Sequence, residues 1–156
     1  MDIKIKTENN LTFNYCARAI IEQEGKFLLI CVNDAPYYHL PGGHVEIGET
    51  SKNAVMREVI EEAGFEIEIE KLVVVNEEFY KKGNADIHSI IFYYLARPKT
   101  KVSTLNVVRM EQGRTKLIKN ELRWVNREEM QTLEILPELI KKLILENKLD
   151  TLQHLI

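Results

Sequence analysis

Residues 40–66 read LPGGHVEIGETSKNAVMREVIEEAGFE, and they join a glycine-rich loop to a helical pattern. Thr50 or Ser51 can cap the N-terminus of a helix, and Gly64 can end it. At about 100° per residue, three carboxylates fall within one arc of roughly 100° on that helix: Glu58, Glu61 and Glu62. The stretch therefore predicts a helix that concentrates negative charge on one side.

The arc beside these carboxylates is apolar and predicts a face that packs on a core. Its members are Val55, Met56, Val59, Ile60 and Ala63. Like charges four residues apart cost roughly a few tenths of a kcal/mol on an exposed helix, so the three glutamates call for a counter-charge. Without one, we expect the neighbouring charges to raise the pKa of at least one of these glutamates.

A hard divalent cation would supply that charge, because Mg²⁺ prefers carboxylate oxygens and is usually completed by substrate phosphates. The alternative for three glutamates alone is a solvated acidic face. The surrounding residues favour a ligand site, since Gly42 and Gly43 let a backbone loop approach a ligand closely. Arg57 lies beside the acidic arc and can tie the helix to the loop through Glu49 or a backbone carbonyl.

The spacing of these residues resembles a known family motif. Gly43 is followed by five residues, Glu49, seven residues and then Arg57-Glu58-Val59-Ile60-Glu61-Glu62-Ala63-Gly64-Phe65. This pattern resembles a complete Nudix box, with no departure at a defining position. The resemblance implies an α/β fold, with residues 1–156 forming a single-domain α/β/α sandwich around a central mixed sheet. It also implies a hydrolase that uses Mg²⁺ or Mn²⁺ while water attacks one phosphorus of a pyrophosphate.

The resemblance also implies roles for the residues of the box. Glu58 and Glu62 would be the principal metal ligands, and the Gly43 carbonyl would complete the metal shell. Glu61 would be a further ligand or the group that orients the attacking water.

Other residues would support this site. Glu49 and Arg57 would hold the loop and the helix together. Many family members use an additional glutamate on a later loop, and this sequence offers four without selecting one: Glu77, Glu78, Glu111 and Glu121.

Several residues outside the box are candidates for substrate binding. Arg18 interrupts an apolar strand, so it lies at a strand edge or points into the cleft; by resemblance, a basic residue here often contacts phosphate. Tyr37, Tyr38 and His39 precede the glycines and could stack on a base or belong to the core. His88 opens a strand and could contact the ligand or make a structural hydrogen bond.

The other strands, turns and helices are predicted from the pattern of apolar, polar and turn-forming residues. Strands are expected at 13–22, 26–33, 66–80, 87–97 and 121–125, the first two as a hairpin. A turn is expected at 111–115, a helical turn at 126–133, and an amphipathic helix at 136–148 with Pro137 at its start. Trp124 is expected to serve in packing.

Composition limits the class of protein. The chain has 156 residues, 45% of them hydrophobic, and no apolar run approaches the ~20 residues of a membrane helix. Residues 1–10 lack the apolar core of a signal peptide, so we expect a cytoplasmic protein that does not bind membranes. Cys16 and Cys31 are then expected to be buried, reduced thiols.

Charge is unevenly distributed along the chain. The net charge is −3, which argues against a long nucleic acid as partner. Residues 46–70 hold eight glutamates against two basic residues, whereas residues 97–119 hold seven basic residues against Glu111. The basic segment could reach substrate phosphates or be a solvated loop.

The sequence therefore predicts a metal-dependent hydrolase of small nucleotide pyrophosphates. ADP-ribose or another nucleotide sugar, a nucleoside triphosphate and an oxidised or otherwise modified nucleotide remain possible substrates. The rival hypotheses are a non-catalytic nucleotide sensor, an RNA 5′-end pyrophosphohydrolase and an interaction domain with an acidic helix. A homodimer is compatible with the sequence.

Overall fold

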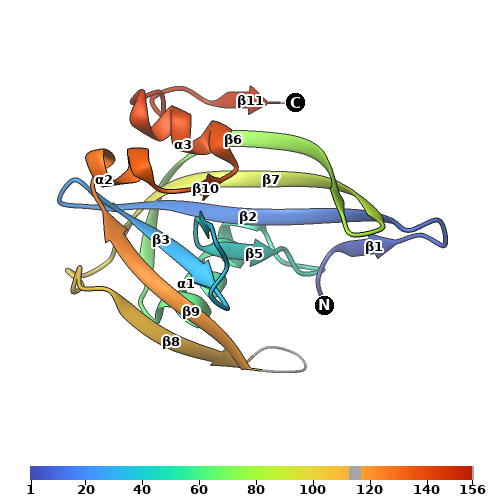
Figure 1. The fold of residues 1–156 in the computed structure, drawn as a ribbon, viewed down its shortest axis with the longest axis horizontal. Coiled ribbons are helices and arrows are strands. Elements are labelled where there is room, and N and C mark those ends of the chain that lie inside the picture. The colour runs from blue at the N-terminus through green and yellow to red at the C-terminus, as the bar shows by residue number, and fades with distance from the viewer. Residues whose placement is uncertain (113–116, 156) are drawn as a thin grey trace.

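The computed structural model describes residues 1–112 and 117–155 (Figure 1). The helices are α1 Ser51–Ala63, α2 Arg127–Thr132 and α3 Glu138–Leu145. The strands are β1 Lys4–Lys6, β2 Leu11–Gln23, β3 Lys26–Val32, β4 Tyr38–His39, β5 Gly42–His44, β6 Ile67–Lys82, β7 Ala85–Pro98, β8 Val107–Gln112, β9 Leu117–Val125, β10 Ile135–Leu136 and β11 Gln153–Leu155.

Strand β2 lies in the interior of a mixed sheet and pairs along both edges. Along one edge it pairs in parallel with β7, which continues to antiparallel β6. Along its other edge it meets β1, then β5, then β3 in turn, all antiparallel. Strand β3 continues to β9, and β8 lies outside β9 as an edge strand (Figure 1).

Alternate side chains of β2 enter two separate cores. Ala17, Ala19 and Ile21 pack with the buried face of α1. Cys16 and Ile20 face the other way and pack with residues of α2 and α3. Because successive strand residues point to opposite faces, the sheet lies between α1 on one side and α2 and α3 on the other (Figure 1). The expected α/β class with a central mixed sheet is confirmed.

One expectation about packing is wrong. Ile60 is 47% exposed, because it lies at the margin of the apolar arc and α1 buries a narrower face. The expected hairpin of β2 and β3 is confirmed but short, with Glu22 paired with Phe27 and Gln23 with Lys26 beside the turn. Strand β3 also pairs with β9, from Phe27 to Val32.

The other elements follow the sequence more closely. Strand β9 is longer than the expected strand, and α3 follows Pro137 as expected. Most of the expected turn at 111–115 lies outside the described residues. Cys16 and Cys31 are both buried and free. Among the described residues, no helix is long and apolar enough to cross a membrane.

Candidate active site

Helix α1 has clear signals at both ends. The Thr50 hydroxyl accepts a hydrogen bond from the Asn53 backbone N–H at 3.2 Å. Gly64 ends the helix in the left-handed region, with φ of 78°. The guanidinium of Arg109 from β8 packs over Gly64, where a Cβ would collide with it. A cation at a helix C-terminus is favourable, so β8 is held against the end of α1.

The two glycines of β5 let the loop lie between β2 and α1. Gly42 has φ of 132°, and a Cβ there would collide with the backbone of Ala17 and Arg18. A Cβ on Gly43 would lie 2.6 Å from the carboxyl carbon of Glu58. Side chains at either position would therefore push the loop away from its neighbours.

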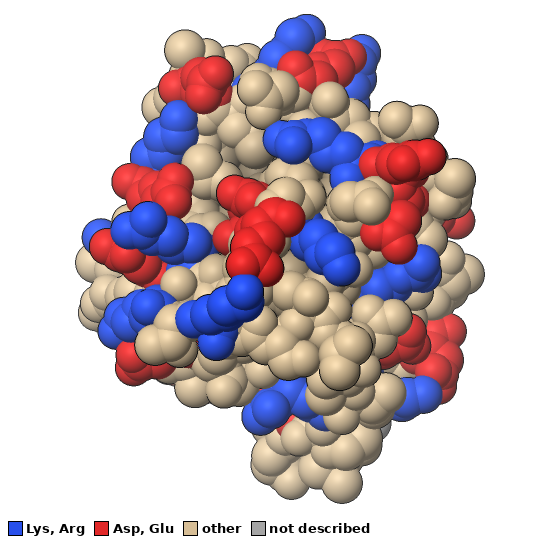
Figure 2. Space-filling view, turned by 90° about the vertical axis from the view of Figure 1, so that its left-hand side faces the viewer, with Lys and Arg blue, Asp and Glu red and all other residues tan. Residues whose placement is uncertain are grey.

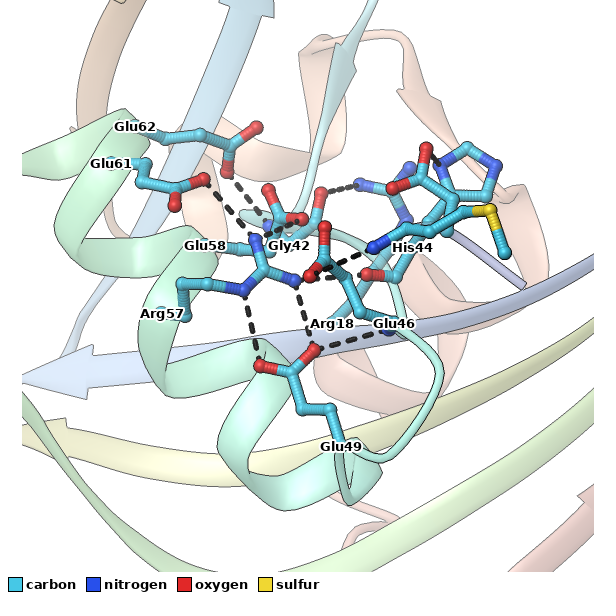
Figure 3. Close-up of polar contacts among 11 residues, drawn as sticks. Arg18, Gly42, His44, Glu46, Glu49, Arg57, Glu58, Glu61 and Glu62 are labelled. Carbon is cyan, nitrogen blue, oxygen red and sulfur yellow. Dashed lines mark hydrogen bonds and ion pairs between the residues drawn. The ribbon is translucent and has the colours of Figure 1, made fainter. Parts of the chain in front are cut away.

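Arg57 connects the loop to the helix (Figure 3). Its Nε and Nη2 donate to the two Glu49 carboxylate oxygens at 3.1 and 3.0 Å, and Nη2 also donates to the His44 carbonyl at 3.1 Å. Its Nη1 donates to Glu58 at 2.8 Å and to Glu61 at 3.2 Å. The hydrogen bonds from Arg57 lower the pKa of Glu49. Arg57 thus places a full positive charge beside one half of the acidic cluster.

Glu62, in the other half of the cluster, forms no ion pair with a cationic side chain in the part of the chain that the structure describes. Glu62 is 8% exposed, and its Oε2 accepts the Gly42 N–H at 2.8 Å. Burial raises the pKa of Glu62 to about 8, and the charges of Glu58 and Glu111 add to the shift. Burial likewise raises the pKa of Glu58. The expected upward shift is present, but burial, rather than repulsion between neighbours, is its main cause.

A cleft of about 280 Å³ opens beside these carboxylates. Its lining residues are Asp2, Cys16, Arg18, Val32, His39, Gly42, Gly43, His44, Glu58, Glu62, Glu111, Ile118 and Asn120. One wall is β2, β5 and α1, and the opposite wall is formed by β3, β8 and β9. Glu61 lies outside this lining, with its carboxylate held by Arg57.

Arg18 belongs to the cleft and not to a strand edge, because β2 is paired on both sides of it, with Gly42 and Tyr93. Its Nη1 donates to the carbonyls of Leu40 at 2.6 Å and Gly42 at 3.3 Å, and lies 3.2 Å from His39 Nδ1. Burial and the Arg18 charge lower the pKa of His39 to about 4. His39 is therefore neutral at pH 7, and its Nδ1 also lies 3.0 Å from the Leu40 carbonyl.

Two other substrate candidates lie away from the cleft lining. The Tyr38 hydroxyl accepts a hydrogen bond from Arg123 at 3.3 Å, and its ring packs under the same guanidinium. His88 Nε2 lies 2.7 Å from Glu77, and its ring stacks on Phe79 with centroids 4.3 Å apart. These contacts join both side chains to other residues of the protein, away from the cleft.

Two further aromatic residues also lie outside the cleft lining. Tyr37 is partly exposed, at 37%, and is not part of the lining. Trp124 stacks on Phe65 in the core, as expected.

Among the four later glutamates, Glu111 is the one that lines the cleft. Its Oε2 accepts a hydrogen bond from Asn120 at 2.8 Å. Glu77 pairs with His88, and Glu78 accepts from Asn76. The sequence could not make this choice, since the register of β8 against β9 brings Glu111 to the cleft. Asn120 was missed, because it directly precedes the expected strand 121–125, in a polar stretch that carries no signal of a site.

The basic segment pairs mainly with acidic residues of the surface. Arg97 contacts Glu68 at 2.8 Å, and Lys99 contacts Glu66 at 2.9 Å. Lys101 pairs with Glu24, and on the face shown in Figure 2 basic and acidic side chains alternate. Its described members behave as a solvated surface, whereas Arg114 and Lys116 lie outside the described residues.

The donor set fits a hard divalent cation. In residues 1–112 and 117–155, no three His, Cys, Asp or Glu side chains already converge on one point. The hydrogen bonds from Arg57 and Gly42 hold Glu58 and Glu62 in their present places. The site nevertheless offers carboxylates whose pKa values are raised by burial, and carboxylate oxygens are what Mg²⁺ prefers.

Comparison with known proteins agrees with this geometry. An ADP-ribose pyrophosphatase of Methanocaldococcus jannaschii is 31% identical over 121 residues, which cover 69% of this chain and 72% of that protein. A UDP-X diphosphatase structure superposes with a TM-score of 0.65 at 19% identity, covering 92% of this chain and 66% of the other. An ADP-ribose pyrophosphatase from Streptococcus suis gives 0.60 at 20% identity, with 91% and 97% covered.

The structural likenesses show a shared fold. The NUDIX domain model matches residues 13–145, which span both walls of the cleft and the whole of α1. The chain therefore belongs to the Nudix family of pyrophosphohydrolases.

Proposed function

We propose that this protein hydrolyses the pyrophosphate bond of a small nucleoside-diphosphate-linked substrate with the help of a bound Mg²⁺, or Mn²⁺, ion. The observation that carries the proposal is the set of carboxylates around one cleft. Glu58, Glu62 and Glu111 line it together with the cationic Arg18. Carboxylates alone would repel a pyrophosphate, so the arrangement makes chemical sense with a cation between them.

In this proposal Glu58 and Glu62 hold the cation, with the Gly43 carbonyl and Glu61 as further oxygen donors. Such a cation neutralises phosphate charge and lowers the pKa of bound water. Arg18 has its Nη1 committed to backbone carbonyls, which aims the guanidinium at the cleft for a phosphate oxygen. Glu111 accepts the proton of the attacking water while the new P–O bond forms and the anhydride P–O bond breaks.

One observation favours a nucleotide sugar, with ADP-ribose first, over a nucleoside triphosphate. The Methanocaldococcus relative carries the name ADP-ribose pyrophosphatase.

The test is product release from a panel of substrates with Mg²⁺, with Mn²⁺ and with chelator. The panel holds ADP-ribose, sugar nucleotides, dinucleoside polyphosphates, common and oxidised nucleoside triphosphates, and a triphosphorylated RNA. We expect metal-dependent cleavage of ADP-ribose or a related nucleotide sugar. Preferred cleavage of triphosphates would overturn the substrate class, and binding without cleavage of any compound would favour the sensor.

A further inference from the structure

Asn120 presents a buried amide to the cleft with one half of its hydrogen-bonding capacity unused. Its side chain is fully buried, at 0% exposed, and it lines the cleft. Its Nδ2 donates to Glu111 at 2.8 Å. Its Oδ1 is buried and has no hydrogen-bond partner within the described part of the chain. Buried polar atoms of this kind are rare, because an unpaired amide oxygen loses its water without compensation.

The strand register explains why Asn120 is suited to hold Glu111. Asn120 faces Val32 on β3 and Arg109 on β8, so its backbone is fixed from both sides. Glu111 faces Ile118, two positions from Asn120, which makes the two side chains diagonal neighbours on one face. Glu111 itself lies on the edge strand β8, which pairs only with β9 among the described strands. The interior strand therefore anchors a carboxylate that the edge strand carries.

The charges in the cleft make this anchor necessary. Glu58 and Glu62 line the same cleft as Glu111, so the three carboxylates repel one another. Arg57 holds Glu58, and the Gly42 N–H holds Glu62. For Glu111, the Asn120 amide is the one side-chain donor recorded among the described residues.

We propose that Asn120 is a positioning residue that acts through Glu111. Its amide N–H₂ fixes the Glu111 carboxylate at the cleft, and its amide oxygen accepts a hydrogen bond from a water of the metal–phosphate complex. This inference rests on the proposed function, since it assigns Glu111 the proton of the attacking water. An amide suits the task because it donates and accepts without adding a fourth charge.

The main test is a double-mutant cycle on kcat and KM with the best substrate of the panel. Asn120→Leu keeps the approximate size and removes both polar atoms. We expect it to lower kcat by about 10- to 100-fold, the usual effect of removing a group that orients a metal-site residue, with a smaller change in KM. In the Glu111→Gln background the same change should cost less than about twofold, because the carboxylate that Asn120 positions to accept the proton is already lost. Equal losses in both backgrounds would overturn the proposal.

A second readout does not need turnover. With chelator, Asn120→Leu should melt at the wild-type temperature or above it, because the unpaired oxygen is gone. The rise in melting temperature on adding Mn²⁺ should be smaller than in wild type. The matched control is Asn76→Leu, a buried asparagine that donates to Glu78 outside the cleft lining. It should leave the Mn²⁺ shift unchanged, and an equal reduction in both variants would contradict the role of Asn120.

Asn120→Asp keeps the side-chain shape and serves if the leucine variant does not fold. It replaces the donor by a carboxylate, so activity should fall at neutral pH and recover partly at lower pH, where a proton on the new carboxyl restores the bond to Glu111. A pH profile parallel to wild type would overturn the proposal. Loss of the Mn²⁺ shift in the Asn120 variants, in a protein that cleaves nothing in the panel, would support the positioning role while the proposed hydrolysis fails.

Discussion

Glu49 and Glu62 belong to the same short motif, yet their environments are opposite. Glu49 receives two hydrogen bonds from Arg57, which lower its pKa. Glu62 is buried beside other carboxylates with one backbone N–H as its partner, and burial raises its pKa to about 8. The difference teaches that Glu49 has a cationic partner within the protein, whereas Glu62 is buried and has no ion-pair partner among the described residues. Environment, rather than residue type, separates a structural carboxylate from a ligand-binding one.

The largest effect should come from removing the charge of Glu62. Glu62→Gln keeps an acceptor for the Gly42 N–H but removes the charge that would hold a cation. We expect kcat/KM to fall by about 10³-fold or more, equivalent to roughly 4 kcal/mol of transition-state stabilisation. With chelator, thermal melting should be equal or higher, because glutamine removes the cost of burying or protonating this carboxylate. Glu70→Gln, on an exposed strand position, is the matched control. Near-normal activity of Glu62→Gln would remove Glu62 from the metal site.

A change at Arg57, the partner of Glu49, should lower stability as well as rate. Arg57→Ala leaves Glu49 and the His44 carbonyl without their donor, so we expect a loss of about 2 kcal/mol in the free energy of unfolding together with a lower rate. Urea denaturation and kcat/KM measure the two effects. Arg57→Lys keeps the charge but not the forked geometry and should be intermediate. An unchanged unfolding free energy with a reduced rate would show that Arg57 does not support the loop.

The smallest expected effect is a difference in how Glu62 and Glu49 change the stability of the protein with pH. Because the folded-state pKa of Glu62 is raised from 4.5 to about 8, its contribution to stability is complete below pH 4.5 and is lost as pH rises toward 8. The lowered pKa of Glu49 gives a contribution that is present above pH 4.5 and lost on further acidification.

Unfolding measured with chelator across pH 3 to 9 tests this prediction. For one proton, the slope assigned to Glu62 cannot exceed about 1.4 kcal/mol per pH unit. Glu62→Gln should flatten the neutral limb, and Glu49→Gln should change the acid limb. A reversed assignment of the two limbs would refute the comparison.

Local signals in the sequence predicted the parts of the site that local structure builds. Thr50 and Gly64 bound α1 where capping rules place them, and the spacing of Arg57 and Glu49 predicted their bond. The long strands β6 and β7 were evident because their β-branched and aromatic runs are strong. These features depend on neighbours close in the chain.

The rest depends on partners distant in sequence. The short strands β4, β5 and β10 owe their form to pairing and carry little propensity of their own. Glu111 could not be chosen over Glu121 without the register of β8 on β9, and Asn120 reaches the cleft through the same register. Ile60 was placed wrongly, because a helical wheel gives the direction of a side chain but not the width of the surface that covers it.

The position of β2 at the centre of the sheet and of β8 at its edge has a consequence for motion. Arg18 sits on a strand paired along both sides, whereas Glu111 sits on a strand paired along one. Central strands exchange their amide hydrogens only with global unfolding, while edge strands open at lower free energy. The two walls of the cleft therefore differ in the free energy needed to open them: β2, which carries Arg18, belongs to the interior of the sheet, whereas β8, which carries Glu111, lies at its edge.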